Sequence, residues 1–275
     1  MMISGSFNTF REIQYGLTQA FLHSGKVVDV GEWQSIRRSE RDLPQQRTVE
    51  LQNVVFSYPI APTMEELQED IKPNHPFAEA QFQDRVGGVP LNPPPSDKLW
   101  PWAAHLDDSK PQGQYSHTYP ERFWPKKAGQ AKQVMDSKLE GGVLPHRGVR
   151  FDYGDLQDVV SQLAKSPHTR QAYLPVWFPE DTGAVHGERV PCTLGYHFLL
   201  REGKLHITYF IRSVDFFRHF PDDVYMACRL CQWVLDRINS MGDFFDWPFT
   251  KCGTLTMHMC SLHVFEAERK RLERS

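Results

Sequence analysis

Four residues with distinct side-chain chemistry lie between positions 191 and 223. Cys192 follows Pro191, Arg212 and Asp215 end a run of alternating apolar residues, and Asp223 opens a helical pattern. A cysteine thiolate adds reversibly to an electron-poor double bond once a neighbouring group lowers the thiol pKa from about 8.5. Because an arginine can act in this way, the stretch predicts nucleophilic chemistry at Cys192. The alternative is a buried structural thiol, a common fate of cysteines.

Two strands and a helix must position these side chains. Residues 189–200 and 205–211 read as strands, and Glu202-Gly203-Lys204 between them predicts a tight hairpin. Apolar residues then recur at helical spacing from Val224 to Met241. A thiol, a guanidinium group and carboxylates are therefore expected to converge from adjacent elements.

The order of these motifs resembles the thymidylate synthase family, in which Pro-Cys, a hairpin, Arg-Ser-x-Asp and a Pro-x-Asn helix start follow one another. Further segments fit the same order, namely residues 155–163, 166–170, 176–179, 253–255 and 263–265. The resemblance is closest from residue 155 to residue 266. It implies an α/β (α+β) fold with a mixed β-sheet flanked by helices, in a single domain of residues 1–275 that dimerises through the sheet.

In that family a thiolate adds to C6 of a pyrimidine nucleotide, and C5 then attacks the methylene carbon of methylenetetrahydrofolate. The resemblance therefore implies that Cys192 is the nucleophile. It also implies that Glu79 supports removal of the C5 proton and that Tyr115 assists this transfer. For Glu79 the simpler alternative is a surface carboxylate.

Asp223 stands where the synthases carry an asparagine that reads uracil, and the cytosine-specific deoxycytidylate hydroxymethylases carry aspartate. A carboxyl group can accept a hydrogen bond from N4 of cytosine and, when protonated, donate one to N3. The alternative is that Asp222 or Asp223 only stabilises the helix start. The synthases also continue into a C-terminal segment that closes over folate, whereas few residues follow His263 here. Both features favour a (deoxy)cytidylate 5-hydroxymethylase.

The remaining substrate contacts also follow from the resemblance. The nucleotide phosphate is expected at Arg212, Ser213, Arg170 and an arginine after the first helix, with Arg37, Arg38 and Arg41 as candidates. His263 is expected to contact the sugar. Phe265 replaces a family tyrosine, which leaves both ribose and deoxyribose open.

The folate and the partner subunit complete the expected site. Asp215, Trp100 and Trp102 are expected to face the folate co-substrate. The arginine that matches Arg170 reaches into the partner's site, so a homodimer is implied. Two rival functions stay open: a deoxycytidylate 5-methyltransferase using the same folate, and a non-catalytic protein that binds pyrimidine nucleotides.

Bulk properties exclude several other classes of protein. The net charge of −3 predicts neither nucleic-acid nor membrane-surface binding. The chain contains no apolar run of roughly 20 residues and no signal-peptide pattern at its start, so a cytoplasmic location is expected. Cys228 and Cys231 have the spacing of a zinc site, but they lie in an apolar helical pattern, and no metal is expected.

Periodicity predicts several further elements that flank the site. Helices are expected at 9–23, 76–85 and 155–164, the last with Asp155 as N-cap, and strands at 48–58, 172–178 and 254–265.

Overall fold

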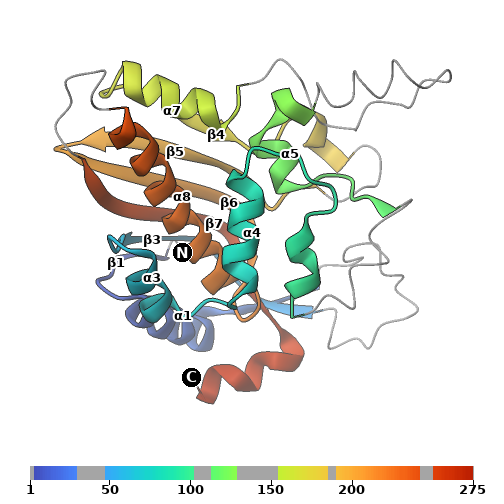
Figure 1. Ribbon diagram of the computed structural model, residues 1–275. Helices are drawn as coiled ribbons and strands as arrows, with labels where there is room; N and C mark the ends of the chain where they lie inside the picture. Colours follow the sequence, from blue (N-terminus) through green and yellow to red (C-terminus); the bar gives the residue numbers. More distant parts are fainter. Residues whose placement is uncertain are drawn as a thin grey trace.

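The computed structural model describes residues 3–29, 47–101, 113–128, 154–184, 190–241 and 250–274. Its centre is a seven-stranded sheet in the order β1-β3-β7-β6-β5-β4, with β2 also paired to β3 (Figure 1). The strands are β1 (Ile3–Ser6), β2 (Lys26–Asp29), β3 (Arg47–Pro59), β4 (Tyr173–Pro175), β5 (Thr193–Arg201), β6 (Lys204–Asp215) and β7 (Lys251–Phe265). The β1–β3 and β6–β7 pairs are parallel and the others antiparallel, which confirms the predicted mixed sheet.

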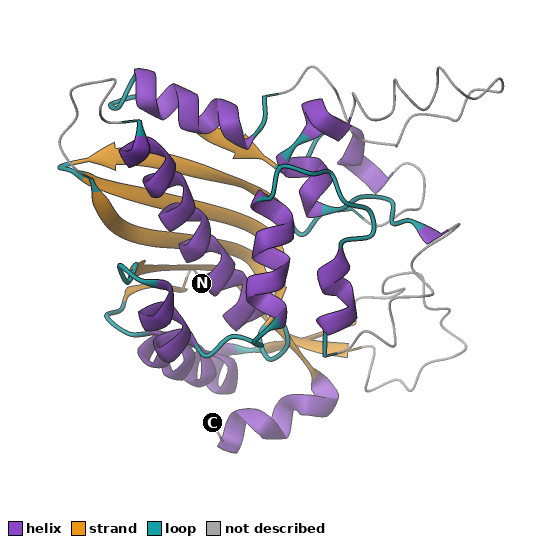
Figure 2. Ribbon diagram, in the orientation of Figure 1, coloured by secondary structure: helices purple, strands orange, loops and turns teal. Residues whose placement is uncertain are grey.

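Helices pack on the sheet and on one another (Figure 2). The α-helices are α1 (Phe10–Ser24), α3 (Met64–Ile71), α4 (Phe77–Val86), α5 (Tyr119–Phe123), α7 (Leu156–Lys165) and α8 (Phe220–Ser240). Three 3₁₀ segments are η2 (Pro95–Leu99), η6 (Pro179–Ala184) and η8 (Glu266–Arg274). Helix α8 crosses the sheet and contacts α3, α4 and α7, so it holds the helical layer together.

The sheet buries one face more completely than the other. On β6, the inward side chains Leu205, Ile207, Tyr209 and Ile211 are at most 1% exposed, whereas their neighbours Thr208 and Phe210 remain half-buried. This alternation is typical of a sheet with helices packed on a single face.

Local signals set the element boundaries largely as predicted. Thr9 caps α1 through the backbone N–H of Glu12, and Asp155 forms a capping box with Asp158 at the start of α7. The hairpin turns at Glu202 and Gly203, whose φ angles of 51° and 69° are typical of a two-residue type I′ turn.

The predicted strand at 172–178 is shorter than expected. It ends at Pro175, and the N–H groups of Val176 and Trp177 both donate to the carbonyl of Leu194, so regular pairing stops there. Helix α3 was not predicted, although its capping box of Thr63 and Glu66 is a readable start signal.

Candidate active site

The β5–β6 hairpin places Cys192 beside Arg212, as the sequence predicts. The backbone N–H of Arg212 donates to the carbonyl of Cys192 at 2.9 Å. The guanidinium donates through Nε to Pro191 O at 2.9 Å and through Nη2 to Val190 O at 3.1 Å. Arg212 thus holds the segment that leads into the half-buried Cys192.

The two acidic residues at the start of α8 have different roles. Asp222 is 1% exposed, and its carboxylate accepts hydrogen bonds from both the backbone N–H and the side-chain amide of Asn74, at 2.7 and 2.9 Å. Asp223 instead lies beside the hydroxyl of Tyr209 on β6. The N-cap of α8 is His219, which forms no side-chain cap bond. Asp222 therefore anchors the α3–α4 connection, and Asp223 faces the sheet.

Burial of Asp223 raises the pKa of its carboxyl group to about 7. Arg85 and the Tyr209 hydrogen bond oppose this rise, and the neighbouring charge of Asp222 adds to it. Near neutral pH the group therefore exists in both protonation states. In one state it donates a proton, and in the other it only accepts hydrogen bonds.

A chain of hydroxyl groups leads from Asp223 toward Cys192. Tyr209 Oη lies 2.9 Å from Thr193 Oγ1, and Thr193 Oγ1 donates to Tyr119 Oη at 3.4 Å. Thr193 follows Cys192 directly, and Tyr119 interacts electrostatically with the Cys192 thiol. These three hydroxyl groups thus lie between Asp223 of α8 and the hairpin residue that follows the nucleophile.

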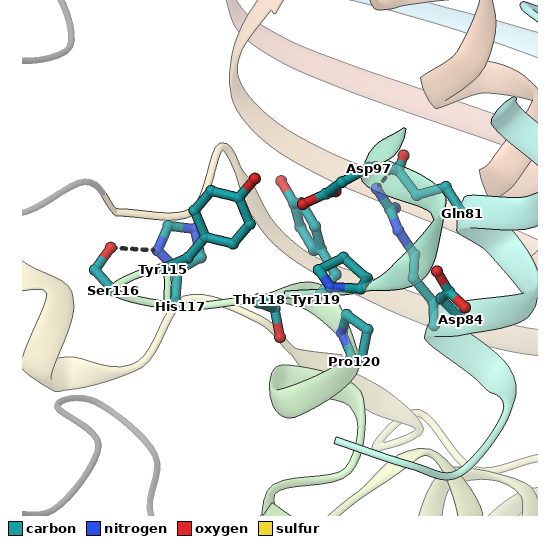
Figure 3. Close-up of a pocket in the computed structure, with 11 residues that line it drawn as sticks. Gln81, Asp84, Asp97, Tyr115, Ser116, His117, Thr118, Tyr119 and Pro120 are labelled. Atoms are coloured by element: carbon teal, nitrogen blue, oxygen red, sulfur yellow. Dashed lines mark hydrogen bonds between the residues drawn. The ribbon is translucent and has the colours of Figure 1, made fainter. Parts of the chain in front are cut away.

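An open pocket adjoins this chain, with an empty volume of about 710 Å³ counted out to solvent (Figure 3). Its wall comprises Gln81, Asp84 and Arg85 of α4, Pro94, Asp97 of η2, and residues 115–120. Tyr115 is part of this wall, as expected of a residue that contacts substrate.

Arg85 is the cation of the pocket wall and is only 4% exposed. Its guanidinium carbon lies 4.1 Å from the centroid of the Tyr119 ring, and Nη2 donates to Gln81 Oε1 at 3.1 Å. Its Nε finds no hydrogen-bond partner among the described residues. The backbone carbonyl of Arg85 accepts from Trp124, so the end of α4 is fixed against α5.

Tyr119 is held in place from both sides. Thr118 and Glu121 form a capping box at the start of α5, which fixes the backbone of Tyr119. One turn further, Arg122 makes a bidentate ion pair with Asp181 at 2.9 and 3.0 Å, and the Arg122 side chain is 1% exposed. The pair joins α5 to η6, in the stretch of chain that precedes the hairpin.

Glu79 does not line the pocket. Arg229 of α8 donates to both of its carboxylate oxygens at 3.0 and 3.1 Å, and the Tyr225 hydroxyl donates at 2.6 Å. Although burial alone would raise it, these bonds, with a further one from Gln83, lower the pKa of Glu79. Its carboxylate is thus engaged between α4 and α8, and its predicted catalytic role stays a prediction.

The residues predicted to face the folate and the sugar lie around the end of β6. Asp215 accepts from the N–H groups of Phe217 and Arg218 and pairs with the Arg218 side chain at 3.1 Å. His263 is its strand partner on β7, and burial lowers the pKa of this imidazole. Trp100 stacks on His219 with ring centroids 5.5 Å apart.

The structure describes some of the residues that are predicted to contact the phosphate. Arg212 and Ser213 are both half-buried on β6, whereas Arg170 is exposed on the loop before β4. Arg37, Arg38 and Arg41 lie outside the described residues, as does Trp102.

Comparison with known proteins decides the family. The sequence profile of the thymidylate synthase family matches residues 101–273. The chain belongs to the thymidylate synthase family. It is similar in fold to thermostable thymidylate synthase A from Bacillus subtilis, with a TM-score of 0.64 and 13% identity over 96% of this chain and 83% of that one. The predicted family and fold are thus confirmed.

Archaeal members of the family are closer to this chain in sequence. A "Putative thymidylate synthase" of Methanosarcina barkeri is 31% identical over 108 residues, which cover 39% of this chain and 44% of that protein. A protein of the same description from Methanothermobacter thermautotrophicus is 27% identical over 148 residues, covering 52% and 60%. This thymidylate synthase family member thus spans about half the length of the curated relatives it matches.

Four residues of this family member were not predicted as site residues, namely Tyr119, Thr193, Tyr209 and Arg85. The capping motif Thr118-x-x-Glu121 could have placed Tyr119 at a helix start. Thr193 could be noted only as the residue that follows Cys192. The alternation of β6 places Tyr209 inward, but it does not show which hydroxyl group it meets.

No three His, Cys, Asp or Glu side chains among the described residues are grouped so that they could hold a metal ion. None of the helices found there combines the length and apolar character that crossing a bilayer requires.

Proposed function

We propose that this thymidylate synthase family member catalyses hydroxymethylation of a cytidine monophosphate at C5, with methylenetetrahydrofolate as co-substrate. The observation that carries the proposal is Asp223, whose pKa is raised to about 7 by burial. It occupies the position at which the uracil-reading synthases have asparagine. An asparagine amide matches uracil, whereas a carboxyl group that is easily protonated matches cytosine.

The cytosine edge is recognised by the two forms of Asp223. A protonated carboxyl donates to N3 and accepts from the N4 amino group, which is the reverse of the uracil pattern. When the thiolate adds to C6, the developing charge is neutralised by transfer of the Asp223 proton to N3. A group with a pKa near 7 is suited to this transfer, because neither protonation state is strongly disfavoured.

The remaining side chains of the site act on the ring and on the phosphate. Cys192 supplies the thiolate, which the charge of Arg212 favours. Tyr115 and Tyr119 both border the pocket and are suited to proton transfer at C5. Ser213, Arg170 and an arginine of the 37–41 segment, such as Arg38, bind the phosphate, and His263 contacts the sugar. Glu79 contributes to proton transfer only if its bonds to Arg229 and Tyr225 rearrange.

The pocket wall fits a flat heteroaromatic ring. The aromatic side chains of Tyr115 and His117 lie on one side of it and the polar Gln81 and Asp84 on the other (Figure 3). Methylenetetrahydrofolate supplies a one-carbon unit at the oxidation level of formaldehyde. Trp100, with Trp102 and Asp215, holds this co-substrate against the nucleotide.

The active form is a homodimer that associates through the sheet. The less covered face of the sheet supports this, because Leu194, Leu199 and Phe210 remain half-buried there. Arg170 is exposed, as a residue that reaches a partner must be. In an equal mixture of an Arg170→Ala variant and a Cys192→Ser variant, each mixed dimer has one site with both residues intact. The mixture should therefore regain up to about a quarter of the wild-type activity. Without such recovery, the shared-site arrangement is wrong.

The decisive experiment is incubation with CMP, dCMP or dUMP plus methylenetetrahydrofolate, followed by mass measurement of the nucleotide product. A gain of CH₂O on a cytidine nucleotide is expected, whereas a gain of CH₂ would identify a methyltransferase. Binding of CMP or dCMP without release of C5 tritium would identify a non-catalytic protein. The Cys192→Ser variant should lose turnover, and full turnover in it would exclude covalent catalysis.

Asp223→Asn tests the base-reading residue directly. The variant should lose at least about 100-fold in kcat/KM for cytidylate and gain activity toward uridylate. Asp158→Asn is the matched control, because Asp158 also lies in the first turn of a helix, and its substrate preference should not change. Unchanged preference in both variants would remove Asp223 from base recognition.

A further inference from the structure

We propose that Cys231 of α8 and Cys252 of β7 are an oxidation site, at which hydrogen peroxide forms a reversible disulfide between the helical layer and the sheet. Cys231 belongs to the Cys228-x-x-Cys231 motif, which the proposed reaction does not use. All three cysteines are free thiols in the structure. None of them belongs to the wall of the pocket, so the cross-link is independent of the proposed function.

A bulge in β7 turns Cys252 toward α8. Across the two parallel strands, Leu205 pairs with Cys252, and Ile207 pairs with Leu255. Strand β7 therefore has one residue more than β6 between the two pairs. Leu205 and Ile207 are at most 1% exposed and face the helices. Because register partners in neighbouring strands point to the same face of a sheet, Cys252 also faces the helices.

The thiol of Cys231 lies at the same point of the sheet. Its Sγ donates to Leu205 O at 3.4 Å, and Leu205 is the residue that pairs with Cys252. The chain just after Cys252 approaches this carbonyl too, because a Cβ atom at Gly253 would lie only 2.9 Å from Leu205 O. The half-buried side chain of Cys252 packs against the core cluster that contains Cys231. The two cysteines therefore converge on one carbonyl group.

The two thiols of the motif on α8 are poorly placed to bridge each other. Cys228 and Cys231 lie three positions apart on one helical face, where Cβ atoms are about 5–6 Å apart. A disulfide requires about 3.5–4.5 Å between Cβ atoms, so a bond within the motif would distort the helix. A bond from Cys231 to another element avoids this distortion, and Cys252 is in position to accept it.

The two sulfur atoms of the proposed bond differ in access and in acidity. Cys252 is half-buried, whereas Cys231 is not exposed at all. Hydrogen bonding with Cys231 lowers the pKa of Cys252, although burial opposes this shift. The same hydrogen bonding, together with burial, raises the pKa of Cys231. Cys252 is therefore the thiolate that meets a small oxidant first, and Cys231 is the thiol that reacts with the product.

The reaction consumes one molecule of hydrogen peroxide. The Cys252 thiolate attacks one peroxide oxygen, so that an S–O bond forms and the O–O bond breaks. Hydroxide leaves and takes up the proton that Cys252 had lost. Cys252 is then a sulfenic acid, and the Cys231 sulfur attacks its sulfur. The S–O bond breaks, and the departing hydroxide takes the Cys231 proton. Two thiols and hydrogen peroxide thus give a disulfide and two water molecules, and a thiol reductant reverses the change.

The disulfide fastens the central helix of the layer to the sheet. Helix α8 contacts α3, α4 and α7, so a covalent bond from α8 to β7 holds this whole layer in place. The bond also restricts the unfolded chain between positions 231 and 252, and Tm should therefore rise by about 5–10 °C on oxidation. Because the sulfenic acid is consumed, Cys252 is protected from irreversible oxidation to sulfinic acid.

Peptide mass spectrometry of the full chain tests the cross-link. The protein is treated with hydrogen peroxide, its remaining thiols are alkylated, and trypsin digestion follows without reductant. Cleavage after Lys and Arg places the three thiols in separate peptides, 219–229, 230–237 and 252–269. We expect peptides 230–237 and 252–269 to be joined, with the loss of two hydrogen atoms, and to separate in dithiothreitol. Since Cys260 shares the last peptide, Cys260→Ser assigns the bond to Cys252.

Cys231→Ala and Cys228→Ala are matched variants, because each removes one fully buried thiol from the same helix. Cys231→Ala should lower the yield of joined peptides at least about tenfold, with Cys252 accumulating as sulfinic acid. Cys228→Ala should keep the yield within about twofold of wild type and should keep the rise in Tm. If Cys231→Ala does not fold, Cys252→Ser removes the same bond at a half-buried position.

Three results would overturn the proposal. The first is the absence of joined peptides from the oxidised wild-type protein. The second is a bond between peptides 219–229 and 252–269, which would assign the reaction to Cys228. The third is a wild-type yield in Cys231→Ala. A Tm that rises equally in oxidised Cys231→Ala and oxidised wild type would overturn the role of the bond in holding the helical layer.

Discussion

Glu79 and Asp223 lie in the first turns of two helices, α4 and α8, that pack against each other. Each carboxyl group has a tyrosine hydroxyl and an arginine in its surroundings. Glu79 is bound bidentately by Arg229, and its pKa is lowered. Asp223 makes no ion pair within the described part of the chain, and its pKa is raised to about 7.

The comparison shows that direct contact with a cation decides the charge state of these carboxyl groups. Burial disfavours ionisation at both positions. Two charge-assisted hydrogen bonds outweigh burial at Glu79, whereas the more distant Arg85 does not outweigh it at Asp223. The first carboxylate therefore joins two helices, and the second can exchange a proton.

The largest expected effect on stability comes from Asp223→Asn. The pKa of Asp223 is about 7 in the folded chain and near its ordinary value of 3.8 when unfolded. Below the lower value both states hold the proton. As pH rises, the unfolded chain loses the proton first, so the contribution of this group to stability falls until the folded pKa is passed. Asp223→Asn abolishes this loss. The free energy of unfolding of the variant minus that of wild type should therefore be larger by about 2–3 kcal/mol at about pH 8 than at about pH 5.

Urea unfolding of both proteins at the two pH values measures this difference. Asp158→Asn is the control, because hydrogen bonds to Lys126 and to the backbone lower the pKa of Asp158 despite its partial burial. This control should show no gain at the higher pH. A pH-independent difference for Asp223→Asn would contradict the raised pKa.

Arg229→Met should have the next largest effect. It leaves the half-buried carboxylate of Glu79 without its cation, so the free energy of unfolding should fall by ~2 kcal/mol. Adding Glu79→Gln should recover part of this loss, because no charge then remains without a partner. Because the pKa of Glu79 is lowered, the ion pair contributes its full stabilisation at pH values above 4.5, the ordinary pKa of the group. This stabilisation is lost as the pH falls further.

Thermal or urea unfolding measures the effect of Arg229→Met, and Arg271→Met is its control. Arg271 pairs with Glu268 at 2.9 Å, but its side chain is 56% exposed. Solvent screens such a pair, so the control should change stability very little. A similar loss in both variants would refute the importance of burial at Glu79.

Tyr225→Phe should lower the free energy of unfolding less than Arg229→Met does. It deletes one hydrogen bond to Glu79 and leaves the ion pair in place, so a loss of about 1 kcal/mol is expected. The pKa of Glu79 should rise, and an NMR titration of its carboxyl group would detect this. A loss as large as that of Arg229→Met would show that the hydroxyl, rather than the cation, holds the carboxylate.

Arg85→Met should have the smallest effect of the four and should act on the other carboxyl group. Loss of the nearby cation should raise the pKa of Asp223 further. At about pH 8, calorimetry should then show CMP or dCMP binding roughly two- to fivefold more tightly, because more of the carboxyl group is protonated. Arg237→Met, on the far part of α8, should leave binding unchanged. Weaker binding in Arg85→Met would instead assign Arg85 a direct contact with substrate.

Local signals in the sequence were sufficient for most of the scaffold. The apolar spacing behind Thr9, the cap at Asp155 and the Glu202-Gly203 turn each act within a few residues, and the structure keeps all three. The neighbouring positions of Cys192 and Arg212 also followed, because a two-residue turn sets the pairing of the two strands, although a register shift between Thr193 and Gly195 moves that pairing by one residue.

Long-range partners could not be predicted in this way. Asp222 and Asp223 are adjacent, but one turns toward Asn74 and the other toward Tyr209. Only the packing of α8 on the sheet distinguishes them. Glu79 likewise meets an arginine 150 positions away in the chain. No periodic pattern encodes such contacts, which is why the tyrosines of the site were missed.

The buried pair of Arg122 and Asp181 couples two parts of the chain that lie far apart in sequence. It fastens the short helix that begins with Tyr119 to η6, upstream of the hairpin. Substitutions of the outer wall at Gln81 or Asp97 should therefore alter the pocket without loosening this junction between α5 and η6.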